Sequence, residues 1–319
     1  MSNFEHGLKV YGIPVLPDLA NKATGNVFFV DSGNVNGADS AGTKGTTIDE
    51  PFVTIDYAIN QCSANNGDII YVLPGHAETL NSSGALIPDI AGVSIVGLGW
   101  GAARPIISMS TSGSNESRIG ISANSVRFSN ITFRANSTAI GSSSVGIRIA
   151  SDDVVIDGCR FDHNSTLSYF ATTIEVATGS DRTVLAGNVF FNKGTTAQSD
   201  RAIDISGTGG HIGTQIINNT FSGNWSGAGV VMGSTDGVYY GLSISDNHIN
   251  NASTIATDRL IYLPSSANIN GGSAGYIQNN FCNAGSSGSS TQLFVAPYFR
   301  GEGNYVANSS GLLMKNFLA

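Results

Sequence analysis

Residues 154–161 read Val-Val-Ile-Asp-Gly-Cys-Arg-Phe, and the chain is organised around copies of this stretch. Each copy places apolar residues on both sides of a short polar turn and ends on an apolar residue. The copies are residues 126–133, 154–161, 184–191, 214–221, 242–249 and 274–281. They recur about every 29 residues, and an internal repeat of that length indicates a solenoid, in which successive copies stack on one another.

A second strand-like series recurs out of phase with the first, at residues 118–121, 146–149, 173–176, 202–205, 230–232 and 260–263. In residues 119–121 and 203–205 the isoleucines lie two apart, which is the side-chain alternation of a β-strand. Gly, Ser, Asn, Thr and Asp separate the strands, as expected of turns. No repeat has a helix-length apolar pattern or a leucine framework. The sequence therefore predicts an all-β fold, a single right-handed parallel β-helix of about eight coils.

Equivalent residues of stacked coils should lie about 4.8 Å apart and form buried ladders. The first expected ladder contains Phe133, Phe161, Phe191, Phe221, Ile249 and Phe281. The second contains Ile121, Ile149, Val176, Ile205, Met232 and Leu263.

Two turn positions also repeat. Asn130, Asn188 and Asn218 share one of them, which predicts an asparagine ladder whose amides bond coil to coil. Cys159 is expected to be a small buried residue at the inward position that Ile131 and Val189 hold in neighbouring coils.

Four regions are expected along the chain: an extended arm at 1–25, an N-terminal cap at 26–92, the β-helix at 93–300 and a C-terminal cap or tail at 301–319. Residues 54–64 predict a short helix in the cap, because Thr54 can cap its N-terminus and Ile55, Ala58 and Ile59 form one apolar face. A solenoid must cover its open end, and a helix before the first coil would do so.

Composition limits the possible partners. The chain has 319 residues and a net charge of −8, and its 15 basic residues are scattered, which argues against nucleic acid. No apolar run is long enough for a transmembrane helix, and residues 1–16 lack a signal-peptide pattern. The cysteines and histidines show no metal-ligand spacing, so we expect neither a metal nor another cofactor.

Two stretches, Pro-Phe-Val-Thr-Ile-Asp-Tyr-Ala-Ile at 51–59 and Gly-Asp-Ile-Ile-Tyr-Val-Leu-Pro-Gly at 67–75, resemble the N-terminal cap of the pectate-lyase-like right-handed β-helix superfamily. More narrowly, residues 12–17, 28–33 and 76–79 resemble a group of tailed-phage virion proteins with this β-helix. The resemblance implies a homotrimer in the virion, made in the host cytoplasm. Its role would be capsid decoration or fibre, or a spike that binds or cleaves host glycan.

The arm is apolar and carries prolines, which block helix and central-strand pairing. We expect a partner surface to hold it, namely the major capsid protein or another virion protein. The alternative is that the arm folds back onto its own coils. The residues expected to contact the partner are Tyr11, Ile13, Pro14, Val15, Leu16 and Pro17.

Glu175 and Asp204 are the candidates for catalysis. Like Arg148, each immediately precedes an inward residue of the second strand series, so the three should form an outward row with neighbours about 5 Å apart. Two carboxylates at that distance match a retaining glycosidase, and their repulsion raises one pKa. In the alternative interpretation the row is merely solvated and Arg148 pairs with Glu175. No aromatic residues are expected to be aligned with it.

The superfamily's lyases use clustered carboxylates, and Asp152, Asp153 and Asp157 are the nearest match here. The next coil has no matching acids, so lyase chemistry is not expected. The sequence favours a non-enzymatic phage structural protein, a capsid decoration or fibre anchored by its arm. The alternatives are a tailspike-like glycosidase or lyase that cleaves host polysaccharide, and a carbohydrate-binding module without cleavage.

Overall fold

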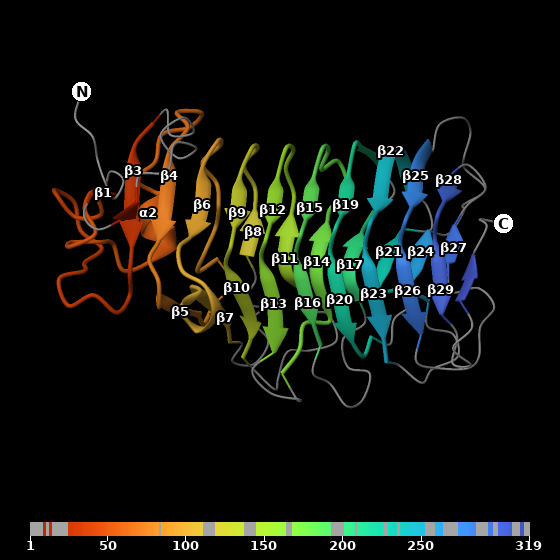
Figure 1. The fold of residues 1–319 in the computed structure, drawn as a ribbon. Coiled ribbons are helices and arrows are strands. Elements are labelled where there is room, and N and C mark those ends of the chain that lie inside the picture. Colours follow the sequence, from red (N-terminus) through yellow and green to blue (C-terminus); the bar gives the residue numbers. More distant parts are fainter. Residues whose placement is uncertain are drawn as a thin grey trace, which may run out of the picture.

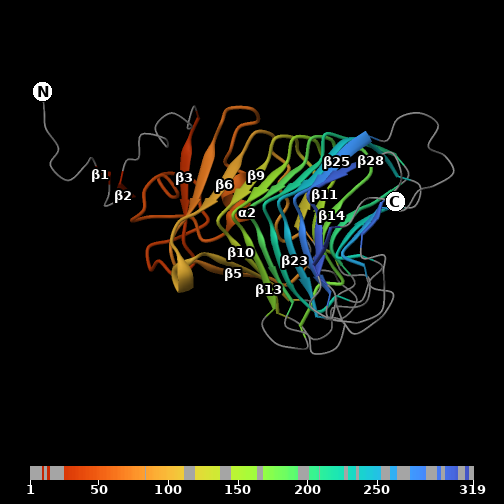
Figure 2. The ribbon, with the colours of Figure 1, turned by 45° about the vertical axis from the view of Figure 1, so that its right-hand side comes forward.

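The computed structural model describes residues 9–10, 13–14, 25–82, 84–110, 119–136, 145–163, 168–192, 201–207, 209–225, 229–234, 237–252, 259–263, 274–284, 293–295, 299–307 and 313–315. This part of the chain forms a parallel β-helix whose strands stack coil on coil along one axis (Figures 1 and 2). The all-β solenoid predicted from the repeats is therefore confirmed.

Three sheets line the column. The ten-stranded sheet consists of β5 (Ala77–Leu80), β7 (Ile106–Met109), β10 (Thr132–Ala135), β13 (Arg160–His163), β16 (Val189–Phe191), β20 (Thr220–Gly223), β23 (His248–Asn251), β26 (Phe281–Ala284), β29 (Tyr305–Ala307) and β30 (Leu313–Lys315). The seven-stranded sheet consists of β8 (Ile119–Ile121), β11 (Val145–Ile149), β14 (Thr172–Val176), β17 (Arg201–Ile205), β21 (Val231–Gly233), β24 (Ile261–Leu263) and β27 (Leu293–Val295). The eleven-stranded sheet consists of β3 (Val27–Val30), β4 (Ile69–Val72), β6 (Ser94–Gly97), β9 (Arg127–Ser129), β12 (Val155–Asp157), β15 (Val184–Ala186), β18 (Gly210–Ile212), β19 (Gln215–Ile217), β22 (Val238–Ser245), β25 (Ala274–Gln278) and β28 (Phe299–Glu302).

The coil count is slightly lower than expected. A complete coil contributes a strand to each of the three sheets. The seven-stranded sheet therefore limits the described residues to seven complete coils, where about eight were expected. At the C-terminal end β30 pairs antiparallel with β29, so the chain reverses there. Near the N-terminus β1 (Lys9–Val10) pairs antiparallel with β2 (Ile13–Pro14). None of the described helices has the length and apolar character to cross a membrane.

A ladder of apolar side chains, four of them phenylalanines, lies in the core beneath the ten-stranded sheet. The members in register are Phe133, Phe161, Phe190, Phe221, Ile249 and Cys282. The Phe161 and Phe190 rings are nearly parallel, with centroids 4.7 Å apart. The prediction of Phe191 and Phe281 was wrong, because the strands of these coils pair one residue away from the expected alignment. A one-residue shift moves a side chain to the opposite face of a strand.

The second ladder follows the seven-stranded sheet. Ile121, Ile149, Val176 and Ile205 are fully buried and in register, as predicted. Gly233, however, takes the place predicted for Met232. A Cβ at Gly233 would lie 2.5 Å from the hydroxyl oxygen of Tyr239, because this buried tyrosine fills the space. The large side chain of Tyr239 on β22 thus requires glycine at the ladder position of the preceding strand, β21.

A buried polar ladder consists of Asn188, Asn219, Asn247, Asn280 and Asn304. Each side-chain amide donates to a backbone carbonyl of the preceding coil, as Asn247 Nδ2 does to the Ile216 oxygen at 2.8 Å. Each Oδ1 accepts from the backbone N–H of the residue at the same position in the preceding coil, as Asn247 Oδ1 does from Asn219 at 2.9 Å. The predicted asparagine ladder is found, and of its three predicted members Asn188 belongs to it.

Asn130 and Asn218 were wrongly assigned to this ladder. Each stands one residue earlier, with φ of 56°, a left-handed turn conformation that asparagine tolerates. Cys159 is buried and takes the ladder position of its coil, as predicted, but its neighbour there is Asn188 and not Val189. Burial raises the pKa of the Cys159 thiol to about 12, so this cysteine is an inert core residue.

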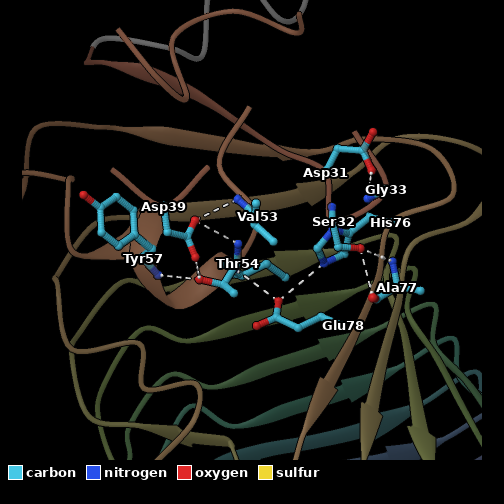
Figure 3. Close-up of polar contacts among 11 residues, drawn as sticks. Asp31, Ser32, Gly33, Asp39, Val53, Thr54, Tyr57, His76, Ala77 and Glu78 are labelled. Carbon is cyan, nitrogen blue, oxygen red and sulfur yellow. Dashed lines mark hydrogen bonds and ion pairs between the residues drawn. The ribbon is translucent and has the colours of Figure 1, made fainter. Parts of the chain in front are cut away.

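The N-terminal cap holds the helix α2 (Ile55–Ile59) against the first strands (Figure 3). Thr54 caps the helix, as predicted, and its hydroxyl accepts from the Tyr57 N–H at 3.4 Å. Glu78 on β5 accepts from the Ile55 N–H at 3.1 Å and lies 3.4 Å from Nε2 of the buried His76. These contacts tie the helix to the first coil.

The helix ends at Ile59, earlier than the predicted 64. The reason is the buried carboxylate of Asp68, which accepts from the Ser63 N–H at 2.7 Å and from the Asn26 N–H at 2.6 Å. These bonds join the segment after the helix to the start of β3, so the chain turns away from the helical path.

Candidate functional site

Successive strands of the seven-stranded sheet align a row of outward side chains that includes the predicted candidates. Arg148 on β11 pairs in register with Glu175 on β14, and Glu175 pairs with Asp204 on β17. The row continues through Met232 on β21 to Tyr262 on β24. We call these five residues the outward row. Neighbouring members of the row belong to successive coils, so they are separated by the distance between adjacent strands, about 4.8 Å. The predicted order of Arg148, Glu175 and Asp204 is found.

The Glu175 carboxylate has two partners. Arg148 Nε lies 3.5 Å from Oε2, and the Ser206 hydroxyl donates to Oε1 at 2.8 Å. The pairing of Arg148 with Glu175 that the alternative interpretation expected is therefore found. The ion pair is partly exposed on its arginine side, so it contributes little to stability but fixes the carboxylate in place.

The Asp204 side chain is more enclosed, with 16% of it exposed, and its Oδ2 accepts from Arg201 Nη1 at 2.8 Å. Burial raises the pKa of Asp204 and the nearby Glu175 charge raises it further, while Arg201 opposes both effects. The two neighbouring carboxylates thus differ in environment, as in sites where one acts as an acid.

An aromatic residue is aligned with these carboxylates, contrary to expectation. Tyr262 lies two coils beyond Asp204, about 9.6 Å along the row. The Arg259 guanidinium lies over its ring, 4.3 Å from the centroid, as in a cation–π contact. The sequence contained the signal, because Tyr262 immediately precedes the inward Leu263 just as Asp204 precedes Ile205. Placing Met232 at the inward position hid the alignment.

The other predicted residues lie elsewhere. Asp152 and Asp153 are both paired with Arg182, and Asp157 is paired with Arg127. Across the described ranges, no three His, Cys, Asp or Glu side chains come together as a metal site would require. These aspartates therefore stabilise turns and strand edges through arginine.

The arm residues are only partly described. Ile13 and Pro14 form β2, so the segment contains a short antiparallel pair where a single extended arm was expected. Tyr11, Val15, Leu16 and Pro17 lie outside the described residues. Their proposed contact with a partner stays a prediction.

No family model matches this chain, and no curated protein matches it. Solved structures do. A pectate lyase, Pel9A, has 8% identity and a TM-score of 0.53, with 91% of this chain and 78% of that chain covered. A pectin methylesterase in complex with a hexasaccharide has 15% identity and a TM-score of 0.50, with 93% of each chain covered.

At these identities the similarity concerns the fold alone, an all-β parallel β-solenoid. A phage protein, ORF18 of Geobacillus virus E2, has 13% identity and a TM-score of 0.33, with 88% of this chain and 60% of that chain covered. A score of that size supports no conclusion about origin or role.

Proposed function

We propose that this protein binds a polysaccharide along the outward row. The observation that carries the proposal is that Glu175, Asp204 and Tyr262 lie on one line fixed by the register of the sheet. Sugars have apolar ring faces that pack on aromatic side chains and hydroxyl edges that bond to charged groups. An extended sugar chain lying along the row would meet both kinds of group in turn.

Binding without cleavage fits the charges of the row best. Glu175 and Asp204 each have an arginine partner, and Ser206 also donates to Glu175. A substrate would have to displace these partners before a proton could move. The raised pKa of Asp204 is the feature that favours the alternative, a polysaccharide-cleaving glycosidase or lyase with Asp204 as general acid.

The test begins with a glycan array that identifies a bound polysaccharide. Tyr262→Ala should then lower the affinity roughly 10-fold or more, because aromatic anchors contribute strongly to binding. Tyr276→Ala is the matched control, since Tyr276 is 52% exposed on the eleven-stranded sheet and should leave the affinity unchanged. Equal losses in both variants, or no glycan bound at all, would overturn the proposal.

Cleavage is tested on the same polysaccharide by measuring the release of reducing ends. We expect none from the natural protein. Release that is lost in both Glu175→Gln and Asp204→Asn would establish the glycosidase alternative instead.

A second candidate role is structural: a homotrimeric virion component, either a capsid decoration or a fibre. Within the described strands, β1 and β2 pair only with each other, so neither extends the three sheets of the coils. This favours a segment around residues 1–25 that serves a partner, such as the major capsid protein or another virion protein. Deleting residues 2–20 should leave the β-helix folded and abolish incorporation into particles. Normal incorporation of the folded, shortened protein would refute this role.

A further inference from the structure

A hollow of about 460 Å³ lies on the ten-stranded sheet, away from the outward row. It is lined by side chains of β7, β10, β13 and β16 and by the loop after β6. The residues that line it are Trp100, Gly101, Ala102, Arg104, Ile106, Thr132, Arg134, Arg160, Asp162 and Val189. Its volume falls within the range of small-ligand sites.

One wall of the hollow is a tryptophan that the loop presents to solvent. Trp100 is 85% exposed, an unusual state for so large an apolar side chain. It stands between Gly99 and Gly101, which have φ of 102° and 60°. Asn130 Nδ2 fixes the loop by donating to the carbonyl oxygens of Gly97 at 2.7 Å and Gly99 at 3.0 Å. The exposure of Trp100 is therefore built into an ordered turn.

The floor of the hollow is positively charged. Arg134 forms a two-point ion pair with Asp162, at 2.8 and 3.0 Å, and Arg160 Nε approaches the same carboxylate at 3.2 Å. No hydrogen bond or ion pair joins the Arg104 side chain to another described residue. Three arginines against one aspartate leave a local charge of +2, in a protein whose net charge is −8.

We propose that this hollow binds a sugar ring that carries a carboxylate. The Trp100 indole would pack on the apolar face of the ring, as aromatic side chains do with flat apolar surfaces. Arg104 and the Nη groups of Arg160, which donate to no other described residue, would donate to the carboxylate, the geometry for which guanidinium is suited. The site shares no residue with the outward row, so it goes beyond the polysaccharide binding proposed there.

The contributions of the anionic group and of the sugar ring to binding can be separated experimentally. Inorganic phosphate offers an anion without a ring, and an uncharged sugar offers a ring without an anion. The hollow should select the ligand that combines both, because Trp100 and the arginines face the same space. Arginine contacts should also weaken as salt is added, since exposed charges are screened.

Intrinsic tryptophan fluorescence can follow binding at this site, because the chain has only two tryptophans. Trp225 is 2% exposed and Trp100 is 85% exposed, so acrylamide quenching of the native protein measures Trp100. We expect sialyllactose or a hyaluronan tetrasaccharide to protect Trp100 from quenching. Lactose should bind at least roughly 10-fold more weakly, and phosphate alone should give no protection. Failure of both acidic probes, or equal binding of lactose, would overturn the proposal.

Variants assign the binding to this hollow by calorimetry. Trp100→Ala should weaken the binding of the acidic probe roughly 30-fold. Arg104→Gln should weaken it roughly 10-fold while leaving the weak binding of lactose unchanged. Arg182→Gln, which alters an arginine elsewhere on the surface, and Tyr262→Ala on the outward row should have no effect. Unchanged affinity in Arg104→Gln would contradict the proposed site without bearing on the outward row. A loss in Tyr262→Ala would also contradict it, because the acidic probe would then bind on the outward row.

Discussion

Replacing Asn247 by alanine tests whether the asparagine ladder stabilises the column. The side chain is about 1% exposed. Its Nδ2 donates to the Ile216 carbonyl oxygen at 2.8 Å and to Asn280 Oδ1 at 2.9 Å. Its Oδ1 accepts from the Asn219 backbone N–H at 2.9 Å and from Asn219 Nδ2 at 3.1 Å. Alanine removes all four bonds and leaves a buried space that is small and lined by polar atoms.

The magnitude follows from the groups that lose their partners. The Asn219 N–H and the Ile216 carbonyl lie inside the turn, and the ladder asparagines around them are buried. A buried polar group left without a partner costs about 1–3 kcal/mol. Two such groups lower the free energy of unfolding by about 2–6 kcal/mol, a large fraction of the stability of an ordinary domain.

The measurement is equilibrium urea unfolding, followed by circular dichroism and by the fluorescence of the buried Trp225. The matched control is Asn283→Ala, an outward asparagine of β26 whose amide makes one bond, to Asn250 Oδ1 at 3.2 Å. The control should change the free energy of unfolding by less than about 0.5 kcal/mol. If Asn247→Ala is no more destabilising than Asn283→Ala, the ladder does not hold the coils together and the reasoning is refuted.

Two further predictions concern Asp204 and Gly97. Because the pKa of Asp204 is raised in the fold above its ordinary 3.8, the protonated carboxyl stabilises the protein below that pH, and this contribution is lost as the pH rises through the raised value. Asp204→Asn cannot ionise, so its urea midpoint should rise relative to that of the natural protein over that pH window, and a relative fall would contradict the assignment. Gly97→Ala should cost about 1–3 kcal/mol, because a Cβ there would lie 2.2 Å from the Asn130 carbonyl oxygen. Gly120→Ala, which meets nothing within 4 Å, should be nearly neutral in the same thermal unfolding experiment, and equal losses would show that the close approach is relieved.

The candidate site was predictable where the repeat is regular. Arg148, Glu175 and Asp204 occupy equivalent positions of coils of similar length, so their alignment could be inferred from the spacing of the isoleucines beside them. The alignment of Tyr262 was missed because Met232 was placed one residue out of register. The Trp100 hollow had no sequence signal, since its residues come from four strands and a loop that only the stacking of coils brings together.

The sequence by itself determined that the fold is a β-solenoid, because an apolar pattern that repeats about every 29 residues can be buried only by stacking each copy on the next. It also determined that asparagine would form an internal ladder, since this side chain can both donate and accept between coils. The tertiary structure alone decided which residue enters each ladder. Phe190 and Phe191 have equal apolarity, and only the register of β16 against β13 and β20 places the first inside and the second outside.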